Sequence, residues 1–219
     1  ELFGLTFPNC LGIAAGFDKE VQAAKGLALL GFGHIEVGTV TPQPQAGNEK
    51  PRVFRLPGDE ALINRMGFPS TGMAAARERL KALSKVNREY IVGVSLGKQK
   101  ETPLSQAAED YIKVLQAVFP YADYLAVNIS SPNTPQLREL QGEKYLGDLL
   151  GALTAENEHQ ASKMQIAPRP LLVKIAPDLS DTELTTIIKV ALDKKIDGII
   201  ATNTTIGRKG LNDANRNQA

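Results

Sequence analysis

Amide and hydroxyl side chains gather at the end of one apolar stretch, residues 124–134, which reads YLAVNISSPNT. The stretch opens with strand-forming residues and turns polar at Asn128, Ser130, Ser131 and Asn133. A buried parallel strand that ends in such a cluster is a common way to build an α/β active site. Amides donate and accept hydrogen bonds at once, so they suit a substrate edge that alternates carbonyl and N–H groups. The alternative is a polar turn in which Ser130 or Asn133 caps the next segment.

Polar side chains recur at the ends of the other apolar segments of the chain. They are Lys19, Thr39, Ser95, Lys174, and the pair Thr202 and Asn203. Each of these alone is explained by a helix cap or a solvated loop. Caps do not explain why polar groups stand at the same end of six successive strands, so we expect these side chains to meet at one rim.

The elements that must position these groups alternate along the chain. Apolar runs predict strands at 11–15, 34–40, 90–96, 124–129, 171–175 and 196–201. Amphipathic patterns predict helices at 21–30, 70–83, 103–118, 145–153 and 180–192. We expect Thr102 to cap the third helix, and Ser180 with Glu183 to form a capping box on the last. Residues 41–69 form a long irregular connection, typical of a lid or binding loop, and 154–168 a polar surface segment.

Alternation of this kind indicates a parallel sheet with helical crossovers. An open doubly wound sheet and part of an eight-stranded barrel both fit. The chain has neither G-x-G-x-x-G nor a Walker lysine motif, which an open nucleotide-binding sheet favours. The barrel places its chemistry at the strand ends, as this chain does. We therefore predict one domain over residues 1–219, a (β/α)8 TIM barrel with about six of its eight βα units present and roughly 70 residues expected beyond it.

Composition restricts the function classes. The chain of 219 residues is 42% hydrophobic and 22% charged, with a net charge of +1, as in ordinary soluble globular proteins. That charge gives no sign of a nucleic-acid partner. One cysteine, Cys10, excludes an internal disulfide, and two histidines far apart in sequence predict no metal site. No apolar run approaches the ~18 residues of a membrane span.

One motif points to a different chemistry. Residues 93–97, GVSLG, match the G-x-S-x-G elbow of serine hydrolases, and His159 lies later in the chain. That motif requires a sharp turn into a helix directly after the serine, but here several residues precede the next predicted helix. His159 lies in the polar segment, so we do not predict a hydrolase.

Several longer motifs carry a family resemblance. They are AAGFDK (14–19), EVGTVTPQPQAGNEKPRVFRLP (36–57), INRMGF (63–68), NISSPNTPQLREL (128–140), LLVKIAPDLS (171–180) and ATNTT (201–205). Together they resemble dihydroorotate dehydrogenase of the quinone-linked, membrane-associated class, in order and over nearly the whole chain. The resemblance implies a flavin-containing barrel that oxidises (S)-dihydroorotate to orotate in UMP biosynthesis. It implies FMN as cofactor and a quinone as electron acceptor.

The resemblance also implies roles by position. The base would be Ser131, where the other classes carry cysteine, with Thr134 first in its proton relay. Substrate would be held by Lys19, Asn64, Arg65, Met66, Gly67, Phe68, Asn128, Asn133, Asn203 and Thr204. FMN would be held by Ala14, Ala15, Gly16, Thr39, Ser95, Asn128, Lys174 and Thr202.

Some features depart from the family pattern. Ser95 stands where the family carries asparagine, which we expect to alter an FMN contact. The chain begins at Glu1, and we expect the N-terminal membrane-docking helices and the last two strands to lie outside it. The resemblance implies a peripheral membrane protein, on the cytoplasmic face of a bacterial inner membrane. Two alternatives stay open: another FMN barrel oxidoreductase acting on a dihydropyrimidine, and a non-catalytic orotate-binding remnant.

Overall fold

A curled, six-stranded parallel sheet organises the chain. The computed structural model describes residues 1–86, 88–134 and 136–218. The strands are β1 (Gly12–Ile13), β2 (His34–Val40), β5 (Ile91–Leu96), β6 (Tyr124–Asn128), β7 (Leu171–Ile175) and β8 (Gly198–Ala201). They stand in the order β1-β2-β5-β6-β7-β8, and every neighbouring pair is parallel. Each strand lies beside the next one in sequence, with no reversal of order, which is barrel topology and not that of a doubly wound sheet.

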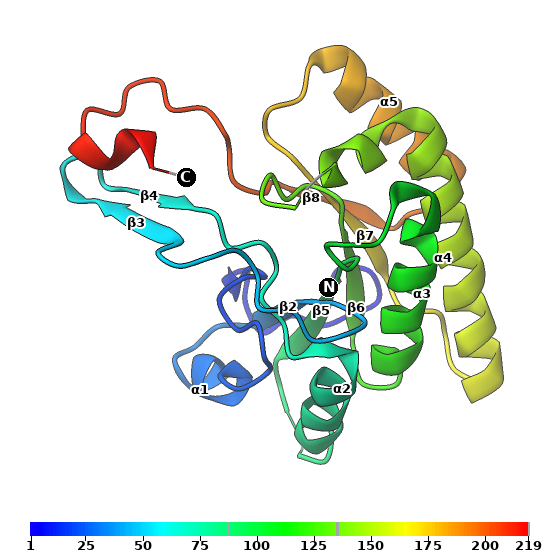
Figure 1. The fold of residues 1–219 in the computed structure, drawn as a ribbon. Coiled ribbons are helices and arrows are strands. Elements are labelled where there is room, and N and C mark those ends of the chain that lie inside the picture. Colours follow the sequence, from blue (N-terminus) through cyan, green and yellow to red (C-terminus); the bar gives the residue numbers. More distant parts are fainter. Residues whose placement is uncertain (87, 135, 219) are drawn as a thin grey trace.

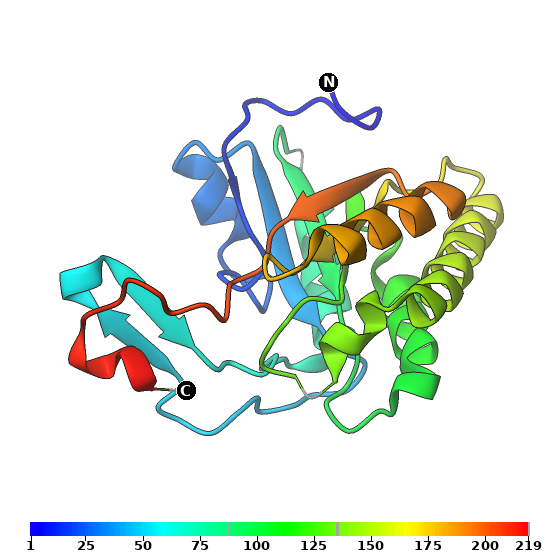
Figure 2. The same cartoon turned by 90° about the horizontal axis from the view of Figure 1, so that it is seen from above.

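A helix follows each of the first five strands of this sheet and returns the chain to the end where the next parallel strand begins. These are α1 (Ala24–Leu29), α2 (Gly72–Leu83), α3 (Ala107–Val118), α4 (Glu143–Met164) and α5 (Asp181–Asp193). Figure 1 shows them outside the sheet, and Figure 2 shows the green, yellow and orange helices α3, α4 and α5 along one side of it. The six-stranded sheet with alternating helices confirms the predicted barrel architecture in its partial form.

The two faces of the sheet have different neighbours. Side chains at alternate strand positions, such as Ile35, Val37, Leu125 and Val127, are fully buried under the helices in the main core. Their neighbours in sequence point to the other face, where Tyr124 and Leu172 form a smaller cluster. Burial of both faces explains why these strands read as continuous apolar runs.

The connection from Thr41 to Pro69 is less irregular than predicted. It contains an antiparallel hairpin, β3 (Val53–Leu56) and β4 (Ala61–Asn64), around the 3₁₀ turn η1 (Pro57–Asp59). In Figure 1 the cyan hairpin projects away from the sheet, beside the red C-terminal segment. The backbone N–H groups of Asn212 and Asp213 donate to the Asp59 carboxylate, which explains this contact between distant parts of the chain.

The prediction of a polar surface segment at 154–168 is wrong for residues 154–164, because α4 continues to Met164. Leu153, Asn157 and Ala161 recur every four residues and are buried, so the polar stretch is one face of a helix. The Asn157 side chain donates to the Arg169 carbonyl, which satisfies its buried amide.

The start of α3 also differs from the prediction. A 3₁₀ turn, η2 (Leu104–Gln106), precedes α3, and no side chain caps the helix. The Thr102 carbonyl accepts a hydrogen bond from the Lys98 ammonium, and Pro103 is extended, so Thr102 does not cap the helix. The Ser180–Glu183 capping box is confirmed on α5. Two further 3₁₀ turns are η3 (Leu137–Gln141) and η4 (Ala214–Asn217).

Candidate functional site

The carboxyl ends of the strands and the hairpin surround a small polar cavity of about 210 Å³. Its lining brings together residues that are up to 189 positions apart, because parallel strands deliver their ends to one edge. The lining residues are Ala15, Gly16, Lys19, Thr39, Val53, Asn64, Met66, Gly67, Phe68, Asn128, Ser131, Asn133, Lys174, Asn203 and Thr204. The sequence therefore predicted most of the residues that line it.

The floor of this cavity is a buried network between β2, β5 and β6. The Thr39 hydroxyl shares a hydrogen bond of 2.9 Å with the Ser95 hydroxyl and accepts another, also 2.9 Å, from the Asn128 amide. All three side chains are buried. Ser95 does not line the cavity and reaches it only through Thr39. A buried, hydrogen-bonded network holds its members in one orientation.

A second network joins the loops that follow β6 and β8. The Asn203 side-chain amide donates to the Ser130 hydroxyl at 3.0 Å and to the side-chain oxygen Oδ1 of Asn128 at 3.4 Å. The side-chain oxygen Oδ1 of Asn203 in turn accepts a 2.7 Å bond from the backbone N–H of Thr204. These contacts fix Asn203, and they use Ser130 as a structural partner.

Ser131 lies beside this network and faces the cavity. Only 6% of it is exposed, and its hydroxyl oxygen accepts a bond from the backbone N–H of Asn133 at 3.3 Å. That bond orients the oxygen and leaves the hydroxyl proton free to be donated. A nearly dry serine hydroxyl directed into a polar cavity suits proton transfer once a substrate closes the site.

Two lysines give the cavity its positive charge. Burial lowers the pKa of Lys19, and the nearby charges of Arg52 and Lys174 lower it further, against an opposing effect of Glu20. A partly desolvated ammonium beside a second cation is an attractive partner for an anionic group. The cavity therefore suits an anionic group.

Lys174 also lines a larger cavity, of about 740 Å³, on the sheet face opposite the helices. Ala14, Glu36 and Tyr124 line it too. The Tyr124 hydroxyl donates to the Glu36 carboxylate at 3.0 Å. Burial raises the pKa of Glu36, although Lys174 and Tyr124 act in the opposite direction. The two cavities thus meet at Lys174, with the small residues Ala14, Ala15 and Gly16 at their border.

Some predicted residues lie outside the small cavity. The Arg65 side chain turns away, donates to the Pro51 carbonyl and lies over the Phe54 ring. Thr202 is exposed, and its hydroxyl donates to the Asn203 carbonyl. The serine of the hydrolase-like motif, Ser95, lies within β5 and is fully buried, as the absence of a turn after it led us to expect.

Sequence reasoning missed several residues that shape the site. Val53 lines the small cavity, and Asn48 donates to the Asn133 carbonyl. Arg138 and Asp178 hold three rim loops together. Arg138 lies in the motif at 128–140 and Asp178 in the motif at 171–180, but no local pattern indicated a role for either residue.

Comparison with known proteins identifies the family. The family model described as dihydroorotate dehydrogenase matches residues 1–218. The chain belongs to the dihydroorotate dehydrogenase family. Two curated relatives are named dihydroorotate dehydrogenase (quinone). The protein from Christiangramia forsetii is 51% identical over the whole of this chain and 62% of its own length. The protein from Chloroflexus aurantiacus is 54% identical over 95% of this chain and 57% of its own length.

Solved structures agree with this family assignment. A crystal structure of DHODH from Eimeria tenella in complex with ferulenol superposes with a TM-score of 0.92 at 40% identity. The superposition covers 99% of this chain and 62% of the Eimeria tenella chain. A ligand-free structure of the same protein gives 0.91 at 41% identity. The chain thus spans about three fifths of the length of these dihydroorotate dehydrogenases and shares their fold throughout.

Proposed function

We propose that this chain forms the substrate-binding and proton-transfer part of a quinone-linked dihydroorotate dehydrogenase, which oxidises (S)-dihydroorotate to orotate in pyrimidine biosynthesis. One observation carries the proposal: a buried serine, two lysines and four asparagines share a single cavity. Family membership supports the reaction, and the cavity supplies the groups that it requires.

Each group in the cavity has a counterpart on the substrate. Lys19 suits the carboxylate, because a partly desolvated ammonium gains most from an anionic partner. The amides of Asn64, Asn128, Asn133 and Asn203 suit the ring carbonyl and N–H groups. Met66, Gly67 and Phe68 line the same cavity, and we propose that this backbone, with that of Arg65, closes the pocket.

Ser131 is the proposed base. Its oxygen takes the proton from C5 while the hydride leaves C6, so that the C5–C6 bond becomes the double bond of orotate. A serine needs a dry site and an outlet for its own proton. Among the described residues the buried Thr134 hydroxyl has no hydrogen-bond partner, which supports our assignment of Thr134 to the start of the relay.

The residues at the border of the two cavities fit FMN. Ala15 and Gly16 carry little or no side chain there, and Gly16 has φ +107°, so the backbone is open to close approach by a flat ring. Bound FMN supplies the acceptor for the hydride. Lys174, which lines both cavities, would supply a cation to the bound flavin, and Ala14, Thr39, Asn128 and Thr202 would complete the proposed contacts. Ser95 contributes through Thr39.

A quinone is the proposed second electron acceptor, since the curated relatives carry that word in their names. A quinone with an apolar tail dissolves in a bilayer, so we propose peripheral association with the cytoplasmic face of a bacterial inner membrane. None of the helices among the described residues is long and apolar enough to span a bilayer. Flotation of the full-length protein with liposomes tests this proposal, and a protein that stays unbound contradicts it.

Anaerobic mixing with dihydroorotate tests the reaction. The flavin-loaded protein should be yellow, bleach on mixing, and bind orotate. Ser131→Ala should stay yellow and bind orotate, but reduce its flavin about 10²–10⁴-fold more slowly, the usual contribution of a general base. Ser180→Ala removes a helix cap that does not line the cavity, so this variant should reduce its flavin normally. Unchanged reduction in Ser131→Ala contradicts the role of the base, and a colourless protein that binds orotate indicates a non-catalytic remnant.

A further inference from the structure

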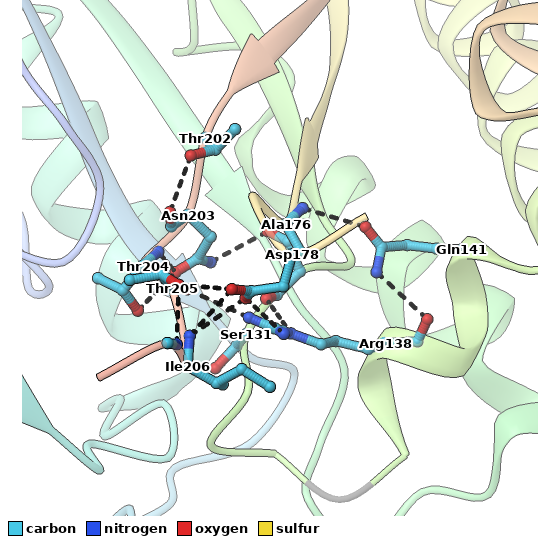
Figure 3. Close-up of polar contacts among 12 residues, drawn as sticks. Ser131, Arg138, Gln141, Ala176, Asp178, Thr202, Asn203, Thr204, Thr205 and Ile206 are labelled. Carbon is cyan, nitrogen blue, oxygen red and sulfur yellow. Dashed lines mark hydrogen bonds and ion pairs between the residues drawn. The ribbon is translucent and has the colours of Figure 1, made fainter. Parts of the chain in front are cut away.

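The Arg138 guanidinium lies where three rim loops converge. Its Nε donates to the Ser130 carbonyl at 3.1 Å, and one Nη donates to the Thr204 carbonyl at 3.1 Å. The other Nη donates to the Asp178 carboxylate at 2.9 Å. Figure 3 shows Arg138 extending from η3 toward Asp178 and Thr204. One side chain therefore connects the loops that follow β6, β7 and β8.

Asp178 extends this connection along the loop after β8. Its carboxylate accepts hydrogen bonds from the Thr205 hydroxyl and from the backbone N–H of Ile206 at 3.1 Å. Partial burial alone would raise the pKa of Asp178, but the bonds from Thr205, Ile206 and Arg138 outweigh this and lower it. The carboxylate therefore stays charged. The segment from Thr204 to Ile206 is held by both members of the pair, because Arg138 bonds Thr204 and Asp178 bonds Thr205 and Ile206.

The held segments carry proposed site residues. Ser130 precedes the base Ser131, and Thr204 follows Asn203, whose amide bonds back to the Ser130 hydroxyl. Neither Arg138 nor Asp178 lines the cavity. We propose that Arg138 and Asp178 are a pair of positioning residues that set the distance between the serine loop and the Asn203–Thr204 wall. This inference rests on the proposed function for its meaning, but the clamp itself does not require a substrate.

The chemistry of the pair supports a geometric role. A guanidinium presents its donors in a rigid plane, so it bonds three acceptors at fixed angles, whereas a lysine ammonium on a flexible stem does not reproduce that fork. The side chains of Arg138 and Asp178 are 23% and 21% exposed, so water competes only partly. Such charge-assisted bonds are stronger than neutral ones.

The molecule offers a matched control at the opposite end of the strands. Arg88 donates to the Asp123 carboxylate and to the Tyr90 carbonyl. Tyr90 directly precedes β5, and Asp123 directly precedes β6. Those side chains are 16% and 20% exposed, close to the values of the Arg138 pair. Arg88→Gln therefore removes a similar ion pair without touching the rim.

The test compares Arg138→Gln, Arg138→Lys and Asp178→Asn with Arg88→Gln in the flavin-loaded protein. Amide hydrogen exchange without ligand and orotate titration are the two readouts. Both Arg138 variants should weaken orotate binding about tenfold or more and expose the Ile206 amide to faster exchange. Asp178→Asn should act in the same direction, and the Arg138→Gln/Asp178→Asn double variant should add little. Arg88→Gln should lower the melting temperature while changing neither readout.

Unchanged exchange at Ile206 in Arg138→Gln overturns the proposal, as does an equal change in Arg88→Gln, which marks general destabilisation. Full retention of orotate affinity in Arg138→Lys overturns the need for a planar fork. If Arg138→Gln does not fold, the same readouts on Asp178→Asn decide the question. Failure of the wild-type protein to bind orotate refutes the proposed function instead, while the exchange result still judges the clamp.

Discussion

The Asn133 side-chain amide donates a hydrogen bond to the side-chain oxygen Oδ1 of Asn64 across 3.1 Å. This bond joins the end of β4 to the loop after β6, and Asn48 adds a second link by donating to the Asn133 carbonyl at 3.2 Å. The hairpin is therefore fastened to the loop that carries Ser131. Two residues that we assign to substrate binding hold each other in place before any substrate arrives.

Asn64→Ala should weaken orotate binding by roughly 10–100-fold, since it removes one contact and frees Asn133 to rotate. Asn64→Asp is the matched variant: it keeps the oxygen that Asn133 bonds but adds negative charge beside an anionic ligand. Calorimetric titration should show that Asn64→Asp binds orotate more weakly than wild type. This loss of affinity should appear even though amide hydrogen exchange at Asn133 stays as in wild type. Wild-type affinity in both variants contradicts the assignment of Asn64 to the substrate.

Tyr111→Phe tests the support beneath the cavity. The fully buried Tyr111 hydroxyl donates to the Asn128 carbonyl at 2.7 Å, and burial, aided by Asp110, raises the pKa of Tyr111 far above its usual value. The phenol therefore remains a neutral donor. Its removal leaves a buried carbonyl unsatisfied, so urea unfolding should show a loss of about 1–3 kcal/mol. Tyr145→Phe, at a half-exposed position, should change stability little, and equal losses in both variants contradict this account.

Lys174→Ala should lose FMN or lower its reduction potential. Lys174 borders both cavities, and a fixed cation stabilises the negative charge that a reduced flavin gathers. A spectroscopic redox titration measures both effects at once. Lys189→Ala, an exposed lysine on α5, serves as the control and should match wild type. A fully loaded Lys174→Ala protein with an unchanged potential shows that Lys174 does not act on the flavin.

The sheet was predictable because its determinants are local. The fully buried run LLVKI gave β7 with the observed bounds, Leu171–Ile175, and the Ser180–Glu183 pair marked the start of α5. Polar residues at successive strand ends then predicted a shared rim, since parallel strands deliver their ends to one edge. The structure places Lys19, Ser131, Lys174 and Asn203 around one cavity, as this reasoning required.

Contacts between distant loops were not predictable. The roles of Arg138 and Asp178 depend on loops 40 and 66 residues from Arg138 in sequence, and no local pattern records such distances. The hairpin was missed because proline, glycine and charge dominate residues 41–69 and hide two four-residue strands. The second half of α4 was missed because the buried face there includes a polar residue, Asn157.

The lowered pKa of Lys19 predicts a conflict between stability and binding. Burial is the largest cause, and Arg52 and Lys174 add to it. Lysine in the unfolded chain titrates near its usual value, so the unfolded state binds more protons between the lowered pKa and that value. Stability should therefore rise with pH across this window and carry the full penalty below it. Lys19→Met removes the buried charge, so it should be more stable than wild type at neutral pH.

Urea unfolding over a pH series measures this effect, with orotate titration beside it. Lys19→Met should lose the rise in stability within the window, and it should bind orotate far more weakly because the carboxylate loses its cation. Lys189→Met removes an exposed lysine and should change neither curve. Because orotate favours the charged ammonium, wild-type binding should take up protons within the window. A Lys19→Met protein that is less stable than wild type at neutral pH shows that Lys19 stabilises the fold. That result contradicts our proposal that the Lys19 charge costs stability and serves ligand binding.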